Sequence, residues 1–261
     1  MYILGIGCYF HDAAAAIIKD GVLLAAAEEE RFTRRKHDYS FPDNAIDYCL
    51  KTAGIEGRDL DYIVFFEKPF LKFERILLTS LQAFPQSLGL FREAMLTWLL
   101  DKLWVKGLIR EKTHIASNKQ ILFSWHHLSH AASAFFCSPF QEAAILTVDA
   151  GGEWATVLQG RGEGNQIHVS REMHFPHSLG LLYSAFTAFC GLEVNEGEYK
   201  LMGMAPYGEP KYMDKIYNLI DVSQDGSFSL DMDYFSFHRS SRYMFSNKFV
   251  KLFGEPKDPA R

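Results

Sequence analysis

The feature that most constrains the fold of this chain is a short pattern of strands that occurs twice. Each copy reads as strand, polar turn, strand, turn, strand, and an acidic residue, Asp12 or Asp149, stands at the first turn. Self-similarity of this kind predicts a duplicated α/β fold whose halves face each other across a cleft and present their first turns to a ligand. The alternative is a chance match between two common β-meanders. The expected strands cover residues 2–8, 13–18 and 22–27 in the first copy and 143–149, 154–159 and 166–173 in the second.

Helices and short strands are expected between the two copies and after the second. Apolar residues recur at helical spacing after Pro42 and across a long stretch that begins near residue 70. Charged residues interrupt the most apolar part of that stretch, so it predicts amphipathic or buried helices and no membrane span. The expected elements are a helix after Pro42, strands over residues 60–66 and 120–123, helices over about 70–110, 179–190 and 211–220, a turn-rich stretch over 195–210, and a polar tail.

Composition narrows the classes of protein to consider. The 261 residues are 48% hydrophobic, which is ample for a buried core in one large domain or two small ones. A net charge of -5 without any long Lys/Arg block argues against a nucleic-acid or membrane surface, so small-molecule partners are expected. Four cysteines far apart in apolar stretches, and a first strand that begins without a secretion signal, indicate a reducing, cytoplasmic compartment.

The stretch "SWHHLSHAASAFF" places three histidines at the start of an expected helix. His126 and His130 are four residues apart, which puts both imidazoles on one helix face, as two ligands of one metal ion require. His127 points elsewhere, and because it stands where a zinc protease has its general-base Glu, the motif is not of that class. The alternative interpretation is a helix N-terminus capped by Ser124, with partly exposed and satisfied histidines.

Asp149 favours the metal interpretation. It ends a strand that follows the histidine-bearing helix and can therefore lie beside the N-terminus of that helix. Two imidazoles and one carboxylate, with positions open for water or substrate, are typical of a catalytic iron or a similar divalent metal. The small-residue turn Ala150-Gly151-Gly152 would let a phosphate approach the backbone N–H groups closely. The alternative is an ordinary hairpin turn, in which Asp and Gly are common.

Two further residues are candidates for catalysis. His11 stands in the first turn of the first copy, and an imidazole titrates near neutrality, which suits a general base. Lys36 lies in the charged cluster "EEERFTRRKHD" and would reach an anionic substrate if that loop folds over the cleft. The alternative interpretations are a surface histidine and a solvated loop.

Six ordered motifs resemble the O-carbamoyltransferase family of nodulation-factor and antibiotic-tailoring enzymes, and the resemblance runs from residue 2 to about residue 215. It implies an α/β fold of the actin-like ATPase (ribonuclease H-like) type, similar to the enzyme that makes threonylcarbamoyl-adenosine on tRNA. The motifs are "GIGCYFHDAAAAIIKDGVLLAAAEEERFTRRKHDYSFP", "FFEKPFLKFER", "HHLSHAASAFFCSPF", "VDAGGEWAT", "HSLGLLYSAFT" and "GEYKLMGMAPYG".

The resemblance also implies how the chain divides. Residues 1–140 are expected to form the first actin-like subdomain, with a helical insertion at about residues 70–115, and residues 141–261 the start of the second. Full-length members of the family continue with the rest of this fold and with a second domain that activates carbamoyl phosphate. We therefore expect this chain to be a C-terminally truncated part that does not turn over alone.

The activity that the resemblance implies is ATP-dependent carbamoyl transfer. Carbamoyl phosphate and ATP form carbamoyl-adenylate, whose carbamoyl group passes to a hydroxyl of a sugar or another small acceptor. The metal ligands of the family match His126, His130 and Asp149, with iron as the usual ion, and a further aspartate ligand has no counterpart here. His11 and Lys36 match positions that face the transfer site. The nucleotide or carbamoyl-adenylate is expected at Ala150, Gly151, Gly152 and Gly180.

Two other functions are left open by the residues. A sugar kinase or ATPase of the same superfold would transfer the γ-phosphoryl group and hold Mg²⁺ through water and carboxylates, which the histidine pair disfavours. A non-catalytic binding domain would use its histidines structurally. One departure from the family pattern is Ala150, where a glycine usually follows the aspartate, and alanine tolerates this position unless its φ is positive.

Overall fold

The chain forms two compact units in a computed structural model that describes residues 1–100 and 102–258. Asp101 and residues 259–261 belong to the expected insertion and second subdomain and lie outside the described residues. The division expected at residue 140 stays a prediction. The first unit comprises Met1–Phe70 and Met95–Ser129, and the second comprises Leu71–Ala94 and His130–Arg261.

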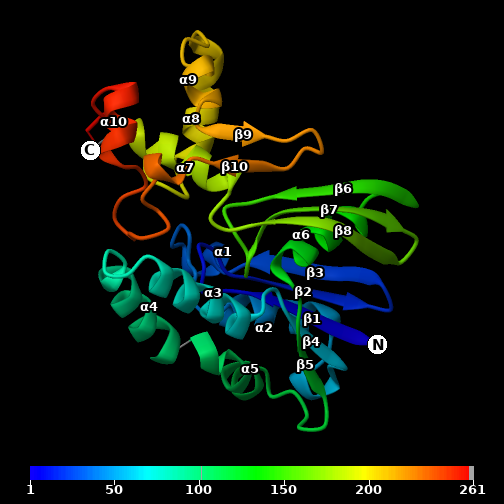
Figure 1. Cartoon of the computed structure of the whole chain (residues 1–261). Helices are drawn as coiled ribbons and strands as arrows, with labels where there is room; N and C mark the ends of the chain where they lie inside the picture. Colours follow the sequence, from blue (N-terminus) through cyan, green and yellow to red (C-terminus); the bar gives the residue numbers. More distant parts are fainter. Residues whose placement is uncertain (101, 259–261) are drawn as a thin grey trace. The chain divides into compact units, whose positions relative to one another are not determined.

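The first unit is built on a five-stranded sheet with the order β3-β2-β1-β4-β5 (Figure 1). The first three strands form the antiparallel meander that the sequence predicts, whereas β4 pairs in parallel with β1 and β5 in parallel with β4. The predicted α/β class is confirmed. The strands are β1 (Tyr2–Gly7), β2 (Ala14–Lys19), β3 (Val22–Glu28), β4 (Tyr62–Phe65) and β5 (Gln120–Phe123).

The core of the first unit lies between this sheet and its helices. Alternate residues of β1, Leu4 and Ile6, point into the core, as a strand with one covered face requires. The helix α2 (Asp43–Ala53) begins directly after Pro42, as predicted, and packs against β2 and β3. Its residues Ile46 and Cys49, three positions apart and buried, form the apolar stripe that holds it there.

Helices fill the connection between β4 and β5, as the sequence predicts for residues 70–110. The last of them ends against the turn after α2, where a Cβ on Gly57 would lie 1.6 Å from the carbonyl oxygen of Thr113. Only glycine fits that close approach. Besides α2, the helices that begin before β5 are α1 (Glu30–Thr33), α3 (Pro69–Gln82), α4 (Leu88–Leu100) and the last one, α5 (Val105–Thr113), with 3₁₀ turns η1 (Gly57–Asp59) and η2 (Lys102–Trp104).

The second unit contains the second predicted meander as a three-stranded antiparallel sheet with the order β6-β7-β8 (Figure 1). The strands are β6 (Glu142–Val148), β7 (Ala155–Glu163) and β8 (Gln166–His174). The expected end of the middle strand at residue 159 is wrong, because β7 continues through Gly160 and Gly162. These glycines serve close packing: a Cβ on Gly160 would meet the His168 carbonyl, and a Cβ on Gly162 would lie 2.6 Å from the Phe135 ring.

Beyond β8 the chain adds an aromatic core that the sequence does not predict. The predicted polar tail is wrong, because Phe235 and Phe249 are fully buried there and pack with Leu182 and Ala185 of α7. The helix expected over residues 211–220 is also shorter than predicted, and the turn-rich stretch before it contains a helix. The elements are α7 (Leu179–Phe189), α8 (Glu198–Met204), η3 (Ala205–Tyr207), α9 (Met213–Tyr217), β9 (Ile220–Val222), β10 (Phe228–Leu230), η4 (Met232–Tyr234) and α10 (Asn247–Phe253).

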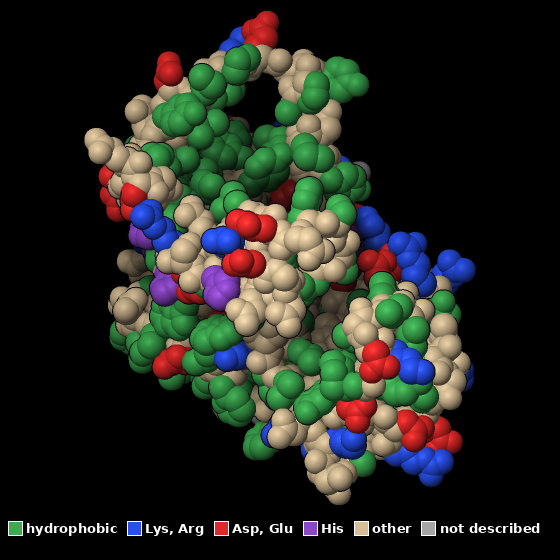
Figure 2. Space-filling view, turned by 90° about the vertical axis from the view of Figure 1, so that its right-hand side faces the viewer, with side chains coloured by type: hydrophobic (Ala, Val, Ile, Leu, Met, Phe, Trp, Pro, Cys, Tyr) green, Lys and Arg blue, Asp and Glu red, His purple; other side chains and the backbone are tan. Residues whose placement is uncertain are grey.

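Apolar side chains are also exposed on the second unit. Figure 2 shows them gathered on the upper part of the face in view, where α8 and α9 lie. The exposed apolar residues of that segment are Tyr199, Met202, Met204, Tyr207, Tyr212, Met213 and Tyr217. Among the described residues, no helix has the length and apolar character needed to cross a membrane.

Candidate metal centre

The helix α6 (His126–Phe135) begins at the first of the three histidines. Its buried residues Ala131 and Phe135 are four positions apart and hold one face of the helix against the protein. His126 and His130 are likewise one turn apart. The alternative of partly exposed histidines does not hold for His126 and His127, which are 5% and 2% exposed, whereas the His130 side chain is 52% exposed.

The start of α6 is fixed on the end of β4. The His126 ring meets the Phe66 ring edge to face, with 5.5 Å between the ring centroids. The Ser129 hydroxyl donates to the Phe66 carbonyl at 2.9 Å. These contacts hold the first turn of α6 in place and with it the direction in which His126 points.

Asp149 follows β6 directly, at the strand end where the sequence places it. Its N–H donates to the Thr156 carbonyl at 3.0 Å, which continues the pairing between β6 and β7. One carboxylate oxygen, Oδ1, accepts the N–H of Ala150 at 2.7 Å. The other, Oδ2, lies 3.6 Å from Nε2 of His130.

Ligand-type atoms of His126, His130 and Asp149 all lie within 4.8 Å of one another. Two nitrogens or oxygens bound tetrahedrally to one ion, at about 2.0–2.2 Å from it, are separated by about 3.4 Å. The 3.6 Å between His130 and Asp149 is close to that separation. The donor set therefore fits a divalent ion of the kind that imidazole and carboxylate hold together.

The charge of Asp149 also acts on His130. A hydrogen bond from the imidazole to this carboxylate raises the pKa of His130, and partial burial of the ring opposes that rise. The carboxylate therefore attracts a positive charge at this position.

The backbone behind Asp149 is held by residues that sequence reasoning missed. Ser178 is fully buried, and its hydroxyl donates to the Asp149 carbonyl at 3.0 Å and accepts the N–H of Leu181 at the start of α7. The buried Thr156 donates to the His177 carbonyl at 2.6 Å. A serine directly before an apolar helix is an N-cap signal, so Ser178 was detectable as a cap. Its contact with Asp149, 29 residues away, was not.

Two backbone N–H groups of the turn after Asp149 donate hydrogen bonds within the turn itself. Ala150 donates its N–H to Asp149, and Gly152 donates its N–H to the Ala155 carbonyl at 2.9 Å. The expected contact of this turn with a phosphate stays a prediction, and it depends most on Gly151, whose φ of +159° favours glycine. Ala150 does not have a positive φ, so the departure from the family pattern causes no backbone strain.

The other expected residues lie in the first unit and in α7. His11 is half exposed in the turn after β1 and contacts Asp12, and the exposed Lys36 precedes His37 in the loop after α1. Gly180 lies in the first turn of α7 against the Asp149–Ala150 peptide. Its expected contact with a nucleotide stays a prediction, as do the catalytic roles of His11 and Lys36.

Comparison with known proteins identifies relatives over the whole described chain. The family model described as carbamoyltransferase N-terminus matches residues 2–259. The uncharacterized protein sll1178 of Synechocystis sp. is 54% identical over 263 residues, which cover 98% of this chain and 43% of that protein. The nodulation protein NolNO of Sinorhizobium fredii is 34% identical over 231 residues, which cover 86% of this chain and 32% of that protein.

The chain thus spans less than half the length of these two relatives. Among solved structures, YeaZ from Pseudomonas aeruginosa is similar with a TM-score of 0.36 and 14% sequence identity, over 67% of each chain. A likeness at this level supports no inference about function.

Proposed function

The chain belongs to the carbamoyltransferase N-terminus family, and from this premise we propose that it takes part in ATP-dependent transfer of a carbamoyl group to a hydroxyl of a small acceptor such as a sugar. The observation that carries the proposal is the set of two imidazoles and one carboxylate at His126, His130 and Asp149. This donor set suits a divalent metal of the iron type. It is unlike the oxygen-only, water-rich coordination that holds Mg²⁺ in phosphotransferases.

The proposed carbamoyl donor is carbamoyl-adenylate, formed from carbamoyl phosphate, water and ATP with release of phosphate and diphosphate. The acceptor oxygen attacks the carbamoyl carbon, a new C–O bond forms, and the bond from that carbon to the adenylate oxygen breaks to release AMP. Because the acceptor hydroxyl loses its proton as the new bond forms, a base must lie within hydrogen-bond reach of it. We assign this role to His11, and a general base of this kind contributes ~10²–10⁴-fold to the rate.

A divalent cation held by His126, His130 and Asp149 would supply Lewis acidity to the carbamoyl-adenylate. The residues of the chain have their own tasks. Asp149 is positioned by hydrogen bonds to its backbone and to Oδ1, so that Oδ2 is directed at His130. The positive charge of Lys36, an exposed residue, would attract the negative phosphate groups of the substrate.

The test is an assay of the full-length protein with carbamoyl phosphate, ATP and a panel of sugars and aminoglycosides. We expect acceptor-dependent release of AMP together with a carbamate ester on the acceptor. His11→Asn should lower kcat by about 10²–10⁴-fold, whereas His168→Asn, at an exposed histidine on β8, should leave it unchanged.

Two outcomes would contradict the proposal. Release of ADP with a phosphorylated acceptor would identify a phosphotransferase of the same superfold. Absence of any acceptor-dependent turnover by the full-length protein, with the fold intact, would favour a binding domain.

A further inference from the structure

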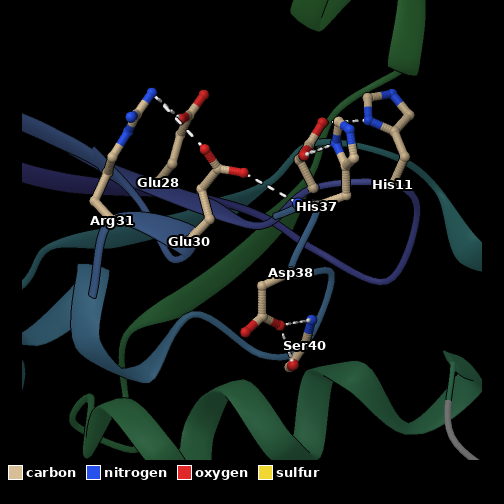
Figure 3. A network of polar contacts seen from close by, with 8 residues as sticks. His11, Glu28, Glu30, Arg31, His37, Asp38 and Ser40 are labelled. Carbon is tan, nitrogen blue, oxygen red and sulfur yellow. Dashed lines mark hydrogen bonds and ion pairs between the residues drawn. The ribbon is translucent and has the colours of Figure 1, made fainter. Parts of the chain in front are cut away.

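One carboxylate joins two loops of the first unit. Asp12, in the turn after β1, contacts Nδ1 of the adjacent His11 through Oδ2 and Nδ1 of His37 through Oδ1, the latter at 3.0 Å. Figure 3 shows the imidazoles of His11 and His37 near each other, each with a dashed line at a ring nitrogen that marks its contact. His37 comes from the loop after α1 that also carries Lys36, so the contact fastens that loop to the turn that holds His11.

The charge of Asp12 decides where the protons of the two imidazoles lie. Partial burial acts to raise the pKa of Asp12, but hydrogen bonds from His37 and His11 outweigh it, so the pKa is lowered and the carboxylate is ionised at neutral pH. An ionised carboxylate only accepts hydrogen bonds. Each neutral imidazole must therefore carry its proton on Nδ1, which leaves the lone pair on Nε2.

The two imidazoles differ in their surroundings. The His11 side chain is half exposed, so its Nε2 can meet a substrate. Nε2 of His37 is buried and has no hydrogen-bond partner among the described residues. This asymmetry assigns substrate contact to His11 and leaves His37 as the anchor of the carboxylate.

Further contacts hold the anchor in place. The N–H of His37 donates to Oε2 of Glu30 at 3.0 Å, and the N–H of Tyr9 donates to the Tyr39 carbonyl at 2.8 Å. His37 itself has a φ of +55°, a conformation that is unfavourable for a non-glycine residue and persists only where contacts impose it. The Glu30 contact joins the loop to α1, and the Tyr9–Tyr39 contact joins it to the turn that carries Asp12.

These contacts also explain a second group of ligand-type atoms. Asp12, Glu30 and His37 bring such atoms within 4.8 Å of one another. Asp12 accepts a hydrogen bond from the His37 ring, and Glu30 accepts one from the His37 backbone. The grouping is thus accounted for by hydrogen bonds and needs no cation.

We propose that Asp12 is a positioning residue that holds His11 in the Nδ1–H tautomer with Nε2 directed at the acceptor hydroxyl, and that His37 anchors Asp12 from the opposite side. The inference rests on the proposed function for the task of His11. A neutral base with a fixed tautomer, paired with a carboxylate that stabilises the imidazolium formed on proton transfer, is the logic of the Ser-His-Asp triad applied to an acceptor hydroxyl.

The direct test is the tautomer of His11 in the wild-type protein. The full chain, labelled with ¹⁵N at histidine only, would be examined by two-bond ¹H–¹⁵N spectra at pH 8, with His11→Asn and His37→Asn used to assign the signals. We expect both imidazoles to show the Nδ1–H pattern. An Nε2–H pattern for His11 would overturn the proposal without any further variant.

The variant Asp12→Asn adds a functional readout. The amide of asparagine can donate to Nδ1, so His11 is expected to change to the Nε2–H tautomer, and kcat of the full-length enzyme should fall by about 10²-fold or more with KM for the acceptor little changed. Asp47→Asn, at an exposed aspartate of α2, is the matched control. Circular dichroism would verify that both variants are folded.

The tautomer and kcat together distinguish the positioning role of Asp12 from the proposed carbamoyl-transfer reaction. An unchanged His11 tautomer in folded Asp12→Asn would overturn the positioning role, whatever the enzyme catalyses. The tautomer change in a protein that shows no carbamoyl transfer at all would support the positioning role and contradict only the proposed reaction.

Discussion

Gly180 lies so close to Ala150 that a Cβ on Gly180 would stand 2.5 Å from the Ala150 amide nitrogen. The neighbouring atoms are all backbone, so no side chain can rotate away to make room. Because Ala150 directly follows Asp149, this contact joins the first turn of α7 to the carboxylate of the candidate metal centre. The position of Asp149 thus depends on Gly180, which has no side chain that could bind a ligand.

Replacing this glycine tests the dependence. Gly180→Ala must push α7 away from the Asp149–Ala150 peptide, and we expect it to lower the free energy of unfolding by about 1–3 kcal/mol and to weaken metal binding. Chemical denaturation and a metal titration would measure the two effects. Gly203→Ala is the control, since a Cβ on Gly203 in α8 meets nothing within 4 Å. A fall in metal affinity in both variants would contradict a specific role for Gly180.

A second prediction concerns Glu29, which belongs to the charged cluster "EEERFTRRKHD". The side chain is 2% exposed, and its carboxylate accepts the backbone N–H groups of Asn44 at 3.2 Å and Ala45 at 2.9 Å. These are orphan donors at the start of α2, whose N-cap residue Pro42 has no side chain that can accept them. Glu29→Ala is therefore expected to lower the free energy of unfolding by about 2 kcal/mol.

The neighbouring Glu28 provides the control for that measurement. It is half exposed and pairs with Arg31 on the surface at 3.3 Å. Glu28→Ala should change the free energy of unfolding by less than about 0.5 kcal/mol. Equal losses from the two substitutions in urea denaturation would show that the buried carboxylate does not cap α2.

A third prediction is a pH dependence of stability that comes from Asp61. Its carboxylate accepts a hydrogen bond from Lys119 at 2.7 Å and one from the Tyr2 N–H at 2.9 Å, and these lower its pKa. The stabilisation is therefore present above the pKa of the unfolded chain, about 3.9, and is lost as the pH falls through the lower pKa of the folded state.

Asp61→Asn should remove this part of the acid dependence. The variant is expected to be less stable than the wild type at pH 7 and to approach it as the pH falls toward 2. Urea denaturation at several pH values would show the difference, with Asp221→Asn, at an exposed position on β9, as the reference. A loss of stability in Asp61→Asn that stays constant across this range would contradict the assignment.

Local sequence patterns predicted the elements that are determined by residues close together in the sequence. Both meanders, the strand β5 and the start of α2 follow from alternation and from Pro42. The aromatic core of the second unit was missed because Phe235 and Phe249 are scattered among polar residues. Their burial results from packing against α7, which is distant in the sequence.

In the candidate metal centre, too, local features were predicted from the sequence and long-range contacts were not. The spacing of His126 and His130 and the strand end at Asp149 are local features, and they are the residues whose ligand atoms the structure brings together. Ser178 and Gly180 support Asp149 through its backbone, across 29 and 31 residues of sequence, and no local pattern encodes such a contact. The role of His37 was likewise missed, because its partner Asp12 lies 25 residues away.

The most direct test of this account is the metal content of the purified full chain after anaerobic equilibration with Fe(II) and removal of unbound metal, measured by mass spectrometry of the element. We expect one ion per chain in the wild type and in His168→Ala, and loss of the ion in His130→Ala and in Asp149→Asn, with each variant verified as folded. Wild-type protein without stoichiometric metal, or full retention of the ion in both ligand variants, would contradict the proposal that His126, His130 and Asp149 form a metal centre.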